Sequence, residues 1–131
     1  MIKEDYLVRM ILEIISLIAN ALLTKKKYRY SEWVEYDCLT RQLLGFPSED
    51  IIGMSTEELI DKYEADPNKM GKIELAGMTM LKLSDDMEAA QLLQKSKLRQ
   101  DGLKLLHYVQ DNSGSFSIQR VQLIGLLESN G

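Results

Sequence analysis

The stretch RMILEIISLIANALLTKKK, residues 9–27, is almost entirely apolar until it reaches three lysines. Its polar side chains nevertheless recur every three or four residues, which places them on one side of an α-helix. The pattern predicts a helix over residues 5–27 that meets water along one narrow line and packs against other helices elsewhere. The residues on this polar line are Asp5, Arg9, Glu13, Ser16, Asn20, Thr24 and Lys27.

The same stretch raises the question of a membrane span. A span needs about 20 consecutive apolar residues, whereas the longest segment without a formal charge runs only from Ile14 to Thr24. Arg9 and Glu13 would also lie inside the bilayer, at a cost of about 2.5–3.5 kcal/mol for each charge. We therefore expect a buried helix of a water-soluble fold. A membrane or interfacial helix and a dimer-forming helix are the two alternatives.

Length and composition are those of an ordinary globular domain. The chain has 131 residues, 45% of them apolar and 27% charged, which fits one domain with its own core. Good helix formers dominate, and only Pro47 and Pro67 interrupt them. The net charge of −4 argues against nucleic acid as the main partner. Cys38 is the only cysteine, so we expect no disulfide within the chain and a reducing, cytoplasmic location.

Turn and cap signals divide the chain into one N-terminal and one C-terminal helical part. Residues 1–45 predict a helical hairpin that ends at Gly45, where a glycine cap is followed by Pro47. Residues 46–66 predict an acidic connector with short helices. In this connector Ser55 and Glu58 have the spacing of a capping box.

Residues 67–131 predict a second hairpin followed by a C-terminal helix. Asp66 and Pro67 are suited to begin a helix that runs to about Leu83. Asp85 and Glu88 have capping-box spacing before a long helix at about 86–110. Ser117 is suited to cap the last helix, at about 117–128, with Phe116 and Val121 packed together beside the cap. The expected fold is a single all-α domain, residues 1–131, with five to six helices.

Residues 73–96 have the spacing of a tetratricopeptide repeat (TPR). Ile73, Ala76-Gly77 and Met80 occupy positions of the W-x₂-L-G-x₂-Y segment of that repeat. Small side chains at Gly77 and Ala89 would let two helices cross closely, and the larger residues would fill the volume around the crossing. The alternative is an ordinary helical hairpin with small residues where its helices cross. The remaining residues that match the repeat are Ala89, Leu93 and Ser96.

The opening MIKEDYLVRMI, the TPR-like hairpin and the FSIQR segment near the end together resemble a family of short bacterial, TPR-like helical proteins without an assigned activity. The resemblance implies a right-handed array of antiparallel hairpins, a cytoplasmic location and a role in protein contacts. It places Glu74, Met78, Leu81 and Lys82 in the binding groove of the repeat. Only Lys82 suits a clamp for a carboxylate, so we expect a mixed or apolar groove.

The sequence contains no pattern typical of catalysis, of a cofactor or of a metal site. His107 is the only histidine, so no histidine pair can hold a metal, and we interpret it as a packing residue. The sequence neighbours of Cys38 include Glu35 and Asp37, which disfavour a thiolate. Glycine-rich phosphate-binding loops are absent from the sequence. We therefore expect no catalytic residue, no cofactor and no metal.

These observations favour a non-enzymatic module for protein–protein interaction. We expect a partner helix or peptide to dock on Met78 and Leu81, with Glu74 and Lys82 setting its orientation. A homodimer through the first helix is one alternative. Contact with an anionic surface, either a membrane or a nucleic acid, is another, although neither is the partner that we expect. The basic cluster for that contact is Lys25, Lys26, Lys27, Arg29 and Tyr30.

Overall fold

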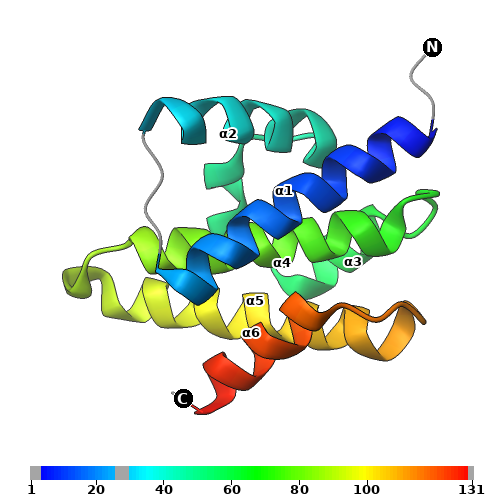
Figure 1. Cartoon of the computed structure of the whole chain (residues 1–131). Coiled ribbons are helices and arrows are strands. Elements are labelled where there is room, and N and C mark those ends of the chain that lie inside the picture. Colours follow the sequence, from blue (N-terminus) through cyan, green and yellow to red (C-terminus); the bar gives the residue numbers. More distant parts are fainter. Residues whose placement is uncertain (1–3, 26–29, 130–131) are drawn as a thin grey trace.

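The computed structural model describes residues 4–25 and 30–129, and the regular structure within these ranges is helical throughout. The prediction of an all-α fold is therefore confirmed. The chain forms six α-helices and two short 3₁₀ turns in these ranges (Figure 1). In chain order they are α1 (Glu4–Thr24), α2 (Tyr30–Leu44), η1 (Ser48–Gly53), α3 (Thr56–Lys62), α4 (Lys69–Asp86), η2 (Ala89–Gln91), α5 (Leu92–Asn112) and α6 (Ile118–Ser129).

Helix α4 is the centre of the molecule. Every residue from Ile73 to Leu81 is buried, because α1, α2, α3 and α5 all contact this helix. Figure 1 shows α1 crossing over α4 on one side while α5 runs beside α4 on the other. The sequence pattern predicted that the helix at residues 5–27 packs against other helices everywhere except along one narrow line, and this prediction is wrong. It is α4 that is surrounded by other helices.

Helix α1 is buried along one side only. Its buried residues are Ile11, Ile14, Ile15, Ile18, Ala19 and Leu22. Arg9, Glu13 and Ser16 are exposed, as the polar line predicted, but Leu12 and Val8 are also exposed, at 56% and 40%. By length and composition alone, Tyr6–Thr24 fits a membrane span, as do core helices of soluble proteins and signal sequences. That α1 belongs to a water-soluble fold therefore stays a prediction.

Two glycines bring α4 and α5 into close contact. A Cβ atom added to Gly77 would lie 3.2 Å from the carbonyl oxygen of Gly102, and one added to Gly102 would lie 3.0 Å from the carbonyl oxygen of Gly77. The prediction of a close crossing at Gly77 is confirmed. Its partner is Gly102, however, and Ala89 lies exposed in η2. Leu93 is 89% exposed, so it does not fill the crossing as the repeat pattern predicted.

Local hydrogen bonds explain three of the helix ends. Gly45 ends α2 with a positive φ of 92°, and its N–H donates to the carbonyl of Arg41. Ser55 and Glu58 form the predicted capping box at the start of α3. The Ser117 hydroxyl accepts from the N–H of Arg120 at 3.2 Å, as expected for the cap of α6.

Three predicted helix boundaries, the two ends of α4 and the start of α5, are wrong. Helix α4 begins at Lys69, after a turn in which the Asp66 carboxylate accepts from the N–H of Asn68 at 2.8 Å. The same helix continues to Asp86, so Asp85 is not the cap of the next helix, and α5 begins only at Leu92. Phe116 and Val121 are 74% and 41% exposed, which does not fit the packed pair predicted beside the Ser117 cap.

Candidate functional site

The predicted partner-binding face lies inside the protein. Met78 is fully buried, and Leu81 and Glu74 are only 3% and 6% exposed. These positions face neighbouring helices because α4 is enclosed, so they do not form a surface on which a partner could dock. Lys82 is partly exposed, and its ammonium pairs with Asp86 at 2.9 Å and lies 4.3 Å from the centre of the Trp33 ring. The contact with Trp33 joins α4 to α2, whereas the pair with Asp86 lies within α4.

Glu74 has a structural partner that the sequence did not reveal. Its carboxylate accepts from the Arg120 guanidinium at 3.0 Å, with side-chain exposures of 8% for Glu74 and 1% for Arg120. Arg120 also donates to the Gln110 side chain at 2.7 Å and to the carbonyl of Ser115 at 2.6 Å. This network fixes the start of α6 against α4 and the end of α5. Both charges are satisfied internally and are not available to a partner.

The predicted basic cluster falls mostly outside the described residues. Lys26, Lys27 and Arg29 are not described, and neither is the side chain of Tyr30, the first residue of α2. Lys25 is described and exposed, and its backbone has a positive φ of 58°. The proposed contact with a membrane or a nucleic acid through this cluster therefore stays a prediction.

A groove, which we call the α1 groove, opens beside the N-terminal half of α1. It has a volume of about 330 Å³. Val8, Ile11 and Leu12 line it from α1, and Met70 and Val109 line it from α4 and α5. The remaining lining residues are Pro67, Asn68, Lys69, Gly71, Glu74, Ser113 and Ser115.

The two charged side chains that line the α1 groove are both paired within the chain. Lys69 donates to Glu64 at 2.7 Å, and this hydrogen bond raises the pKa of Lys69. Glu74 is held by Arg120 as described above. The groove therefore offers apolar side chains and little uncompensated charge.

Further exposed apolar residues lie just before α6 and on it. Phe116 directly follows the groove residue Ser115, and it is 74% exposed. Ile118 and Val121, one helical turn apart on α6, are 61% and 41% exposed. Single exposed apolar residues are normal on a protein surface, but clusters of them indicate a binding surface.

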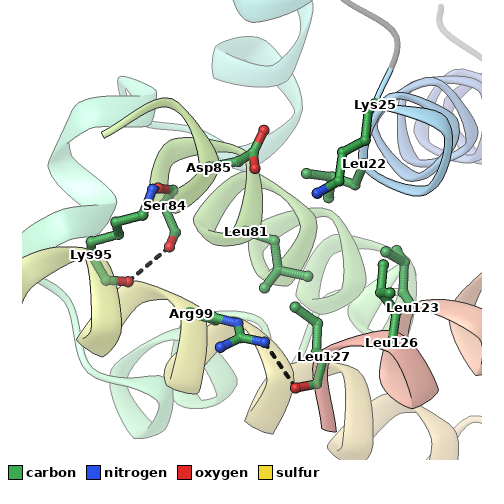
Figure 2. Close-up of a pocket in the computed structure, with 10 residues that line it drawn as sticks. All are labelled: Leu22, Lys25, Leu81, Ser84, Asp85, Lys95, Arg99, Leu123, Leu126 and Leu127. Atoms are coloured by element: carbon green, nitrogen blue, oxygen red, sulfur yellow. Dashed lines mark hydrogen bonds between the residues drawn. The ribbon is translucent and has the colours of Figure 1, made fainter. Parts of the chain in front are cut away.

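A second cavity, which we call the basic pocket, lies where α1, α4 and α6 end and α5 begins (Figure 2). Its volume is about 320 Å³. Lys25, Lys95 and Arg99 line it together with one carboxylate, Asp85. The other lining residues are Leu22, Leu81, Ser84, Leu123, Leu126 and Leu127.

Hydrogen bonds to backbone carbonyls hold two cations of the basic pocket in place. The Lys95 ammonium donates to the carbonyls of Ser84 and Met87, at 2.6 and 3.0 Å. The Arg99 guanidinium donates to the carbonyl of Leu127 at 2.9 Å, and Figure 2 shows this bond joining α5 to α6. Basic side chains near helix C-termini stabilise the last carbonyls in this way.

His107 and Cys38 do not belong to either cavity. His107 lies 3.0 Å from the Glu128 carboxylate and links α5 to α6. Cys38 is exposed on α2. Among the described residues, no group of three or more His, Cys, Asp and Glu side chains gathers in a way that could hold a metal ion.

Comparison of the chain with known protein families, with curated proteins and with solved structures found no match. The proposals below therefore rest on the geometry and chemistry of this chain.

Sequence reasoning missed Arg120, Lys95 and Arg99. The helical period alone places Arg120 on the same face of α6 as Leu123 and Ile124, which follow it at spacings of three and four residues. All three residues are buried. Lys95 and Arg99 are four residues apart on one face of α5, which is a recognisable pair. Nothing in the sequence, however, indicates that this face meets the ends of α4 and α6.

Proposed function

We propose that this chain is a non-enzymatic module for protein–protein interaction, and that an apolar segment of a partner protein docks in the α1 groove. The observation that carries the proposal is the exposure of Leu12, Val8 and Phe116 at and beside an open groove with apolar walls. This site replaces the face at Met78 and Leu81, which is buried.

The charge pattern of the groove supports an apolar partner segment. Lys69 and Glu74 are neutralised by Glu64 and Arg120 before any partner arrives. A partner charge placed there would lose water without gaining an opposite charge in return. One apolar face of a helix, laid along the groove, would instead bury the exposed side chains at about 25 cal/mol per Å² of apolar surface.

The proposal is tested with Leu12→Glu and with Leu93→Glu as its matched control. Both leucines are exposed, at 56% and 89%, so neither change should unfold the protein. Leu93 does not line the α1 groove. Proteins crosslinked to each variant in the producing cells are identified, and the candidate partner is then purified and its affinity measured by calorimetry.

We expect wild type and Leu93→Glu to bind the purified partner equally and Leu12→Glu to bind at least about tenfold more weakly. Equal binding by all three proteins would reject the groove as the docking site. Analytical ultracentrifugation of the purified chain tests whether a second copy of the chain occupies the α1 groove. A wild-type dimer that Leu12→Glu converts to a monomer would replace the partner-protein proposal with homodimerisation.

A further inference from the structure

The basic pocket is a separate site that the interaction proposal does not use. The α1 groove is lined from the N-terminal half of α1, whereas the basic pocket is lined by Leu22 and Lys25 at the C-terminal end of that helix. We propose that the basic pocket binds a small aliphatic carboxylate. The evidence comes from its fixed cations, its leucine walls and its local charge.

Lys95 and Arg99 both have more N–H donors than their hydrogen bonds within the chain use. A lysine ammonium has three N–H donors and an arginine guanidinium has five. The hydrogen bonds described above use two donors of Lys95 and one of Arg99. Because these bonds already hold both side chains in place, a ligand loses little of its binding free energy to ordering them.

The walls of the pocket select for an aliphatic group. Five leucines line it, and Leu22, Leu81 and Leu123 are at most 9% exposed, so they form a rigid floor. Leu126 and Leu127 are partly exposed and form the side toward α6. The volume of about 320 Å³ is roughly twice the ~150 Å³ of an apolar cavity that binds benzene. It therefore suits a ligand with one short hydrocarbon chain.

The local charge selects for an anion. Lys25, Lys95 and Arg99 give three positive charges and Asp85 one negative charge, so the formal charge of the lining side chains is +2, whereas the whole chain carries −4. The carbonyls at the C-terminal ends of α1, α4 and α6 offset part of this positive charge. The planar guanidinium of Arg99 matches a carboxylate, which it can hold with two parallel hydrogen bonds. A carboxylate on an aliphatic chain thus satisfies both the cations and the leucines.

Lys25 provides an independent indication. Its φ of 58° lies in the left-handed region, directly after the end of α1 at Thr24. Glycine or asparagine adopts this conformation more readily, and lysine does so at a cost of about 1–2 kcal/mol. The conformation places a cation at the pocket where a glycine would give the more stable helix end. A left-handed residue commonly ends an α-helix, and here that residue is a lysine that brings a third cation to the pocket.

Sodium octanoate is the probe, and binding is followed by calorimetry and by NMR chemical shifts of the full chain. We expect shifts at Leu126 and Arg99, and an affinity for octanoate at least about tenfold higher than for 1-octanol or acetate. N-acetyl-leucine, which resembles the carboxyl end of a peptide, tests a second source of an aliphatic carboxylate. Tighter binding of N-acetyl-leucine than of octanoate would assign the pocket to the carboxyl end of a peptide, and the reverse order to a free fatty acid.

Three variants separate ligand binding from stability. Lys25→Gly should be at least as stable as wild type, because glycine tolerates the positive φ, and should bind octanoate about fivefold more weakly. Arg99→Gln should weaken binding about tenfold. Lys97→Gln is the control, because Lys97 is exposed on the same helix and pairs with Asp101 outside the pocket. Its affinity should equal that of wild type.

Two results would overturn the proposal. One is equal binding of octanoate and 1-octanol, which would mean that the cations only stabilise helix ends. The other is unchanged octanoate affinity in both Lys25→Gly and Arg99→Gln. Leu12→Glu should bind octanoate normally, so failure of the α1 groove proposal and failure of this one are distinguishable.

Discussion

Gly102→Ala is the substitution that tests the crossing of α4 and α5 most directly. A Cβ atom at residue 102 would lie 2.9 Å from Cγ and Cδ2 of Leu81 and 3.0 Å from the backbone oxygen of Gly77. Alanine favours the helix by about 1 kcal/mol over glycine. Overpacking costs about 1–3 kcal/mol, and we expect the upper end because a backbone oxygen cannot move aside alone. The free energy of unfolding should therefore fall by about 2 kcal/mol in Gly102→Ala.

Gly125→Ala is the matched control. Gly125 lies within α6, and a Cβ atom there would meet nothing within 4 Å. The helix preference should therefore act alone and stabilise the protein by up to about 1 kcal/mol. The two variants should differ by about 3 kcal/mol, or roughly 10 °C in Tm for a chain of this length. Circular dichroism at 222 nm during heating and urea titration measures both quantities.

A rise in Tm for Gly102→Ala as large as that for Gly125→Ala would refute the close crossing of α4 and α5. That result would mean that α4 and α5 are further apart than the glycine contacts indicate. The Leu81→Ala/Gly102→Ala double variant tests whether the added Cβ at residue 102 clashes with Leu81, whose side chain contributes the nearest atoms. Leu81→Ala alone should cost about 2–5 kcal/mol, and the double variant should lose less than the sum of the two single losses.

Three further predictions concern single interactions. Arg120→Met should lower the free energy of unfolding by about 3–5 kcal/mol, because it leaves Glu74 as a buried unpaired charge. The Glu74→Met/Arg120→Met double variant should recover part of this lost stability. Ser55→Ala should cost about 1 kcal/mol by removing the α3 cap. Wild type should lose stability above pH 10, because burial, followed by the charge of Asp66, raises the pKa of Tyr63. Tyr63→Phe should lose less stability over the same pH range.

The sign of the alkaline effect follows from the Tyr63 environment. Its hydroxyl donates to the Leu44 carbonyl at 2.6 Å, and its side chain is 3% exposed. The unfolded phenol ionises near pH 10 while the folded one keeps its proton, so the stabilisation is complete below pH 10 and decreases as the pH rises. Urea titrations at pH 8 and pH 10.5 measure this effect. Equal slopes of stability against pH for wild type and Tyr63→Phe would contradict the assignment.

Urea titration at pH 7 measures the other two predictions. Arg120→Met is contradicted if it loses no more stability than an exposed arginine substitution would. For the α3 cap, Thr56→Ala is no control because Thr56 is buried, whereas Ser96→Ala changes an exposed serine inside α5. If Ser55→Ala loses no more stability than Ser96→Ala does, the Ser55 cap does not stabilise the protein.

The sequence by itself determined the helical class and three of the local helix ends. The hydroxyl of Ser55, the glycine at residue 45 and the Ser117 cap act on backbone groups only three or four residues away, so their roles follow from spacing alone. The polar line of α1 was also correct at Arg9 and Glu13, because the helical period is local.

Only the tertiary structure decided which helix is central and which residues line the two cavities. Glu74 and Arg120 are 46 residues apart in the chain, and the two halves of the Gly77–Gly102 contact lie on different helices. Met78 is buried although its apolar character would suit a surface contact equally well. Burial depends on which elements pack around a residue, and that packing joins segments whose separation in sequence carries no periodic signal.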